Sequence, residues 1–162
     1  MLQNGRTMDK EDEVAKVREG ALAAEENVRG LSPLLDEVQR FFLADRYATE
    51  TLEPEVIEAS CGHAVVRMRL SSTHRNAMGR VMGGALFTLA DFALAIAVNV
   101  GQPPTTSVSS TIEYLANVHG DELTASCDVD HGGRRACYAT CDVFDETGRH
   151  VVRVMSTCFR TS

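Results

Sequence analysis

The sequence predicts an α+β domain in which an antiparallel sheet wraps around one long central helix. One apolar stretch, residues 83–100, is long enough to be a buried helix. The segments on either side of it alternate apolar and polar residues with a period of two, which is typical of half-buried strands. The 162 residues, 44% of them hydrophobic, are enough for one domain with its own core.

The chain is predicted to divide into an N-terminal arm and one domain. Residues 1–30 form the arm, because the segment 9–30 is rich in Ala, Glu and Lys with only a thin apolar stripe. A solvated helix is the favoured interpretation of this arm, and a role in self-association is the alternative. The domain, residues 31–162, begins with a helix from Ser32-Pro33, a typical N-cap and first helical residue, to about Arg46.

Six strands are predicted, two before the central helix and a four-strand meander after it. The central helix ends at Gly101-Gln-Pro-Pro104, and the last strands are separated by turns at 131–134 and 145–148. The strands are 49–59, 63–70, 106–115, 122–130, 135–144 and 150–160.

Composition argues against several function classes. A net charge of −7 is unlike that of nucleic-acid binders, which need a basic surface. The apolar stretch is too short and too polar to span a bilayer, and no secretory signal is visible at the N-terminus. The five Cys are expected to be reduced thiols in a cytoplasmic protein. Neither a nucleic-acid nor a membrane partner is therefore expected.

Cys137 and Cys141 are the pair that most invites a metal site. Four residues of a strand span about 13 Å, too far for one ion whose Zn–S bonds are near 2.3 Å. Both are therefore expected to be small core residues, and no metal site is predicted.

Asp91 lies in the middle of the central helix, where 13 of the 16 residues from Ala85 to Val100 are apolar. Burial would cost such a carboxylate several kcal/mol and raise its pKa toward the range of a general base. Gly84, Thr88 and Ala95 share its helical face, and these small residues predict a groove for an elongated substrate. The alternative is that Asp91 only bonds a backbone donor or an Arg of a neighbouring strand.

Gly83-Gly84 begins the same helix. The first N–H groups of a helix are unpaired at its positive end, and Gly allows close approach, so a bound carbonyl would be polarised there. The alternative is a simple tight turn. Because Gly84 and Asp91 are about 10 Å apart along the axis, one helix cannot bring both to the same carbonyl. If both are catalytic, antiparallel helices of two subunits must meet, which predicts an obligate dimer with shared sites.

The segment from His74 to Asp91 resembles the signature H-x-N-x-x-G-x-x-H-G-G…L-A-D of hotdog-fold acyl-CoA thioesterases. The PaaI-like, phenylacetate-degradation-type branch is the most similar. The match continues through residues 112–115, 118–123 and the Gly-Arg hairpin at 133–134, and it covers about residues 45–160.

The resemblance implies a hotdog fold with active sites at a dimer interface, often paired again into tetramers. It implies that Asp91 is the general base or nucleophile, that the Gly83 N–H polarises the thioester carbonyl, and that Asn76 orients the water or the carbonyl. A hydroxyl on the strand after the helix assists. Ser107 best matches this position, and a period of two would put Ser109 and Thr111 on the same face.

The resemblance also implies which residues contact substrate. Gly84 and Thr88 lie on the groove face. Arg134 and Arg135 follow the turn near which relatives meet the coenzyme A phosphates. They are expected either to contact these phosphates or to be plain solvated charges. The second His of the signature is Met82 here, so a polar ring beside the oxyanion site is lost. His74 either positions the loop or contacts substrate, and a solvated loop His is the favoured role.

The function predicted is hydrolysis of an aryl- or short/medium-chain acyl-CoA, with no cofactor beyond the coenzyme A of the substrate. One alternative is a non-catalytic acyl-CoA-binding hotdog protein, which Met82 favours. Another is a hotdog hydratase, which usually has a His–Glu or His–Asp pair. No His falls on or beside the central helix.

Overall fold

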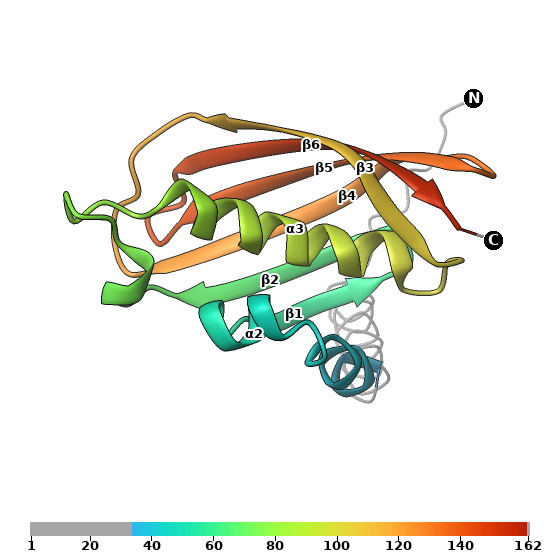
Figure 1. Ribbon diagram of the computed structural model, residues 1–162, viewed down its shortest axis with the longest axis horizontal. Coiled ribbons are helices and arrows are strands. Elements are labelled where there is room, and N and C mark those ends of the chain that lie inside the picture. The colour runs from blue at the N-terminus through green and yellow to red at the C-terminus, as the bar shows by residue number, and fades with distance from the viewer. Residues whose placement is uncertain (1–33, 162) are drawn as a thin grey trace, which may run out of the picture. The chain divides into compact units, whose positions relative to one another are not determined.

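The computed structural model describes residues 34–161, which form a six-stranded sheet with one long helix across its face (Figure 1). The helix is α3 (Gly83–Asn99), within one residue of the predicted central helix. The predicted α+β architecture is therefore confirmed. The predicted arm, residues 1–30, and its boundary with the domain lie outside the described residues. No helix within 34–161 is both long and apolar enough to cross a bilayer.

Two short helices precede the sheet. Residues 34–42 are helical, and α2 (Arg46–Leu52) follows after a break at 43–45. The strand predicted from residue 49 is wrong over 49–52, because these residues complete α2 and place Ala48 and Leu52 on one buried helical face. Glu53, in a left-handed conformation with φ of 47°, ends the helix just before Pro54.

All strand pairs are antiparallel, and the sheet order is β1-β2-β4-β5-β6-β3. The predicted four-strand meander is therefore wrong for β3, which pairs with β6 at the far edge instead of with β4. α3 crosses the face of the sheet, so the chain that leaves α3 enters β3 at the edge opposite β1 (Figure 1). The place beside β2 is then taken by β4. The strands are β1 (Glu55–Ser60), β2 (His63–Arg69), β3 (Thr105–Tyr114), β4 (Glu122–Gly132), β5 (Ala136–Asp145) and β6 (His150–Arg160).

The core lies between α3 and the sheet face that it covers, called here the inner face. Leu89, Ile96 and Ala97 of α3 are completely buried against it. Four of the five cysteines are buried there as free thiols, as predicted for Cys137 and Cys141. They form two cross-strand pairs, Cys127 with Cys141 and Cys137 with Cys158.

One face of α3, opposite the buried residues of its core side, is open to the outside. The expectation that α3 is buried nearly all round is wrong here, because Gly84 is exposed and Thr88, Asp91 and Ala95 are only half-buried. These four residues follow the helical spacing that the sequence indicated. The fold therefore presents one stripe of its central helix to the outside instead of to the sheet.

Candidate active site

Asp91 lies in a groove between α2 and α3 with a volume of about 530 Å³. Thr88 and Ala95 line this groove beside Asp91, whereas Gly84 does not. The groove walls are Asp45, Arg46, Tyr47 and Ala48 from the start of α2, and Phe87, Thr88, Asp91, Phe92 and Ala95 from α3.

The Asp91 carboxylate has neither a hydrogen bond nor an ion pair with any residue from 34 to 161. Nothing in that part of the chain therefore supports the alternative in which Asp91 only bonds a backbone donor or an Arg. Burial raises the pKa of Asp91 above its ordinary value, and the negative charge of Asp45 raises the pKa further. An unpaired carboxylate with a raised pKa at the wall of a groove is suited to accept a proton.

The N-terminus of α3 presents two free donors. Met82 occupies the N-cap position without a side-chain cap, and the N–H groups of Gly83 and Gly84 meet no acceptor in the described part of the chain. A Cβ atom on Gly84 would meet open space, whereas one on Gly83 would lie 2.7 Å from Oη of Tyr114. A side chain at 83 would therefore displace the Tyr114 ring, whereas at 84 the backbone is open to a ligand.

His74 is buried, with only 5% of its surface exposed, so the expectation of a solvated loop His is wrong. The main-chain N–H of Ser71 donates to Nδ1 over 2.9 Å, which leaves the proton on Nε2 to donate to the Thr51 carbonyl over 2.7 Å. The N–H of Met82 donates to the His74 carbonyl over 2.9 Å. His74 thus joins the end of α2 to the loop before Gly83, and neither ring nitrogen is left for a substrate.

Asn76 is exposed on the loop before α3, and its side-chain oxygen is already used. Oδ1 accepts the N–H groups of Met78, over 2.9 Å, and Arg80, over 3.1 Å. This pattern closes the loop in the way Asn commonly does in turns. Only the Nδ2 amide remains for the predicted contact with water or carbonyl.

Ser107, Ser109 and Thr111, the three candidate hydroxyl residues of β3, do not share one face. The prediction from a period of two is therefore wrong. A bulge between Ser107 and Ser109 inserts an extra residue, so Ser107 pairs with buried Cys158, whereas Ser109 pairs with Thr157. Partners in register share a face, which puts Ser107 on the inner face. Ser109 and Thr111, the latter paired with Met155, lie on the outer face. Of the three, Ser107 alone is on the side of α3.

Arg134 and Arg135 are exposed in the turn between β4 and β5. The Arg135 carbonyl accepts the N–H of Arg160, whose guanidinium donates to Gln102 just after α3. The turn therefore lies at the C-terminal end of α3. Because α3 has 17 residues, its two ends are about 24 Å apart. Within one chain the two arginines lie far from the Gly83 end.

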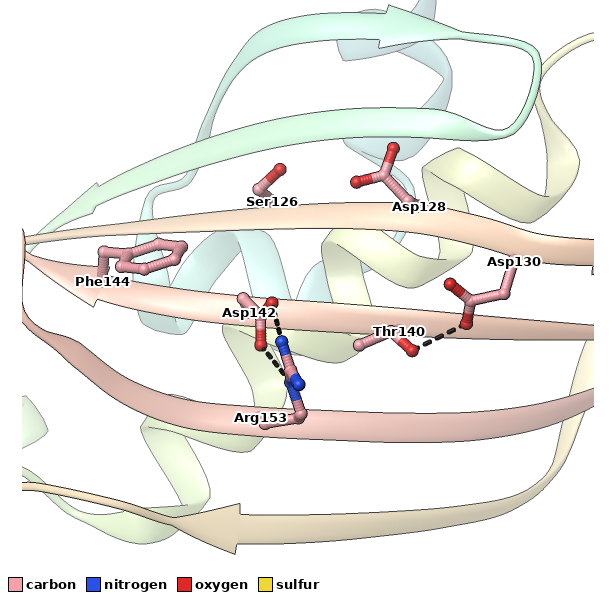
Figure 2. Close-up of a pocket in the computed structure, with 7 residues that line it drawn as sticks. All are labelled: Ser126, Asp128, Asp130, Thr140, Asp142, Phe144 and Arg153. Carbon is pink, nitrogen blue, oxygen red and sulfur yellow. Dashed lines mark hydrogen bonds and ion pairs between the residues drawn. The ribbon is translucent and has the colours of Figure 1, made fainter.

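A second hollow, of about 410 Å³, lies on the outer face of the sheet (Figure 2). Each of its charged side chains already has a partner. The Arg153 guanidinium donates twice to Asp142, each over 2.7 Å, Thr140 donates to Asp130 over 2.7 Å, and Asp128 lies 2.7 Å from Nδ1 of His63. It shares no residue with the groove at Asp91. Its walls are Ser126, Asp128, Asp130, Thr140, Asp142, Phe144 and Arg153.

Residues 34–161 contain no group of three His, Cys, Asp or Glu side chains placed to hold a metal ion. That the reaction needs no metal or redox cofactor stays a prediction.

Comparison with known proteins decides the family. Residues 78–152, which include the Gly pair and all of α3, match the family model of the thioesterase superfamily. A mutant form of a hypothetical thioesterase of Streptococcus pneumoniae is 31% identical, over 67% of this chain and 90% of that one. The chain belongs to the thioesterase superfamily. The prediction of a hotdog-fold thioesterase of the PaaI-like kind, an enzyme of the thioester hydrolase class, is therefore confirmed at the level of fold and family.

Two relatives illustrate the likeness. A putative esterase of Archaeoglobus fulgidus is 26% identical over 133 residues, 81% of this chain and 86% of that protein. Acyl-coenzyme A thioesterase PaaI of Escherichia coli is 35% identical over 82 residues, which are 50% of this chain and 59% of PaaI.

Two solved structures share the fold. The PaaI protein from the phenylacetic acid degradation operon of E. coli has a TM-score of 0.73 and 26% identity, over 82% of this chain and 96% of that one. A hypothetical thioesterase of Streptococcus pneumoniae, solved with coenzyme A, has a TM-score of 0.69 and 27% identity, over 75% and 97%.

Sequence reasoning missed Asp45 and Tyr114. Asp45 falls within the helix predicted to run to about Arg46, and only the break at 43–45 brings it to the groove. Tyr114 falls within the strand predicted over 106–115, and its contact with Gly83 depends on how the end of β3 meets the start of α3.

Replacing Asp45 with Asn should lower the pKa of Asp91. The change removes a nearby negative charge that disfavours the ionised carboxylate, so Asp91 should stay ionised to a lower pH than in the wild type. A ¹³C NMR titration of the Asp91 carboxyl carbon measures this pKa directly. Asp128→Asn, on the outer face of the sheet, is the matched control and should leave it unchanged. An unaltered Asp91 titration in Asp45→Asn would contradict the account of this pair.

Proposed function

We propose that this chain is an acyl-CoA thioesterase whose reaction depends on the carboxylate of Asp91 and the N–H group of Gly83. The carboxylate carries the proposal, because it has no partner among residues 34–161, lies in a groove with apolar walls beside it and has a raised pKa. The substrate class is supported by two relatives, one named acyl-coenzyme A thioesterase and one solved with coenzyme A.

In the proposed reaction Asp91 takes a proton from water as the water oxygen attacks the thioester carbonyl carbon. The negative charge that develops on the carbonyl oxygen is stabilised by the Gly83 N–H at the positive end of α3. The C–S bond then breaks, and the proton held by Asp91 passes to the departing thiolate. In the alternative route Asp91 attacks the carbon itself, the C–S bond breaks and the thiolate departs, which leaves a mixed anhydride. Water then hydrolyses the anhydride to the free acid and restores the Asp91 carboxylate.

Both groups act on one carbonyl only if two chains contribute to the site. Gly83 and Asp91 are eight residues apart on α3, about 12 Å along the axis, whereas attack needs groups within about 3.5 Å of the reacting atoms. An antiparallel pair of α3 helices would bring Gly83 of one protomer to Asp91 of the other. The open stripe of α3 supports such a contact.

Strand β3 supports the same dimer. It is an edge strand with β6 on one side and no pairing strand on the other among the described residues, and its Val108 side chain is exposed. Long unpaired edges are templates for pairing with another chain. We propose a homodimer in which two β3 edges and two α3 stripes meet. Pairing of such dimers into tetramers stays a prediction.

The acyl group is proposed to occupy the groove between α2 and α3. Its volume of about 530 Å³ and its walls of Phe87, Phe92, Ala48 and Ala95 suit an aryl or a short to medium acyl chain. The thioester would lie at Asp91. Arg134 and Arg135 would reach the coenzyme A phosphates only from the partner chain, because their own turn lies at the far end of α3 from Gly83.

A non-catalytic acyl-CoA-binding protein is the second candidate. Met82 favours it, because this side chain stands exposed at the N-cap of α3, where the family signature has a His, and offers no hydrogen-bond donor. A hydratase has less support. His74 is committed to Thr51 and Ser71, and no His lines the groove at Asp91.

Thiol release from a panel of aryl-, short- and medium-chain acyl-CoAs tests the function. The wild type should release coenzyme A thiol, and Asp91→Asn should lower kcat by about 10²- to 10⁴-fold because it cannot accept the proton. Asp128→Asn should retain the wild-type rate. Binding across the panel without thiol release would favour the acyl-CoA-binding protein, and loss of enoyl absorbance with an enoyl-CoA would favour the hydratase.

Mixing two inactive variants tests whether the site is shared. Gly83→Pro removes the N–H donor at the first helical position, and its Cβ would also displace the Tyr114 ring, so it inactivates the Gly83 side of the site. Asp91→Asn removes the base. In a mixed dimer with shared sites, one site carries both changes and the other carries neither. An equal mixture after subunit exchange should therefore recover about a quarter of the wild-type activity. No recovery, with exchange shown by differently tagged chains, would mean that each site lies within one chain.

A further inference from the structure

Tyr114 brings a phenol hydroxyl to the start of α3. It is the last residue of β3 and pairs with buried Val152, so its side chain lies on the inner face. A Cβ atom on Gly83 would lie 2.7 Å from Oη, 2.9 Å from Cζ and 3.1 Å from Cε1 of Tyr114. The hydroxyl end of the ring therefore lies close to the Gly83 backbone, at the start of the helix.

The strand end and the glycine loop hold this contact in place. Nη1 of Arg80, in the loop before Gly83, donates to Oδ1 of Asn117, three residues after Tyr114, over 3.2 Å. The N–H of Leu115 donates to the Val151 carbonyl over 2.9 Å, which keeps the chain on the sheet just beyond Tyr114. The tyrosine and the glycine are thus fixed from both sides, as a preorganised donor requires.

The hydroxyl itself is free. The side chain of Tyr114 is 55% exposed, and its Oη makes no hydrogen bond with any residue in the described part of the chain. A phenol O–H both donates and accepts, and it is usually paired where it lies against protein. A donor without a protein partner, next to two unpaired backbone N–H groups, is available to a bound oxygen atom.

We propose that the Tyr114 hydroxyl is a second hydrogen-bond donor to the thioester carbonyl oxygen, beside the N–H of Gly83, and is thus a catalytic residue. This inference rests on the proposed function. The hydroxyl transfers no proton: it donates a hydrogen bond as charge develops on the oxygen and loses it when the carbonyl re-forms and the thiolate leaves. Tyr114 would supply a polar donor near the position where Met82 replaces the His of the family signature.

The hydrogen bond should strengthen as the carbonyl oxygen becomes charged. An interaction that is stronger in the transition state than in the bound substrate changes kcat, whereas one of equal strength in both changes KM. A purely structural role for Tyr114 would depend on its ring, not on its oxygen atom. Phenylalanine keeps the ring that packs on Gly83 and removes the oxygen alone, so it separates the two roles.

Steady-state thiol release by wild type, Tyr114→Phe and Tyr138→Phe tests the proposal with the best acyl-CoA of the panel. Tyr138 is an exposed tyrosine of β5, and its replacement is the matched control. Tyr114→Phe should lower kcat by about 10-fold or more and change KM by less than about threefold. Inhibition by a CoA thioether, which lacks the carbonyl oxygen, should be equal in wild type and Tyr114→Phe.

The outcomes separate this proposal from the proposed function. An active wild type with full kcat in Tyr114→Phe overturns the role of Tyr114 and leaves the thioesterase intact. A loss in Tyr114→Phe that is matched by weaker thioether inhibition also overturns it, because the ring would then act in binding. A wild type that releases no thiol from any acyl-CoA overturns the proposed function and this inference with it.

Discussion

The Asp91 carboxylate lies on the same helix that supplies much of the core, and this combination constrains the rest of the structure. Most of the α3 surface is buried against the sheet and α2, so this helix has only one stripe on which it can carry a charged group. Asp91 occupies that stripe without a partner from residues 34–161, and burial together with Asp45 raises its pKa. An unpaired carboxylate on the central helix costs stability, which is a common feature of functional sites.

The sequence predicted best those elements whose pattern is local. α3 and five of the six strands follow from periodicity, because an apolar helix and alternating strands have different repeats. α2 could not be predicted because two buried residues, Ala48 and Leu52, are too few to display a helical period. The end of α2 at Glu53 depends on its left-handed backbone, which the sequence does not indicate. The edge position of β3 depends on the path of the chain across α3, which no local pattern contains.

The candidate site likewise has features that a local pattern predicted and features that depend on the folded chain. The helical spacing of Gly84, Thr88, Asp91 and Ala95 correctly predicted one stripe, and all of these except Gly84 line the groove that was predicted there. The bulge at Ser107 could not be read from alternation, since one extra residue reverses every face after it. The burial of His74 could not be predicted because Thr51, whose carbonyl accepts its Nε2 proton, becomes a neighbour only through folding.

Cross-linking between α3 helices tests the shared site most directly. If Gly83 of one protomer faces Asp91 of the other, position 87 lies at the two-fold axis, and Thr88 is within about 3 Å of its own copy along the axis. In a chain whose exposed Cys61 is replaced by Ser, Thr88→Cys should form an intersubunit disulfide, which needs Cα atoms within about 7 Å. Ala95→Cys should not, because its copies would be about 24 Å apart along the axis. Cross-linking at 95 and none at 88 would contradict the antiparallel arrangement on which the shared site depends.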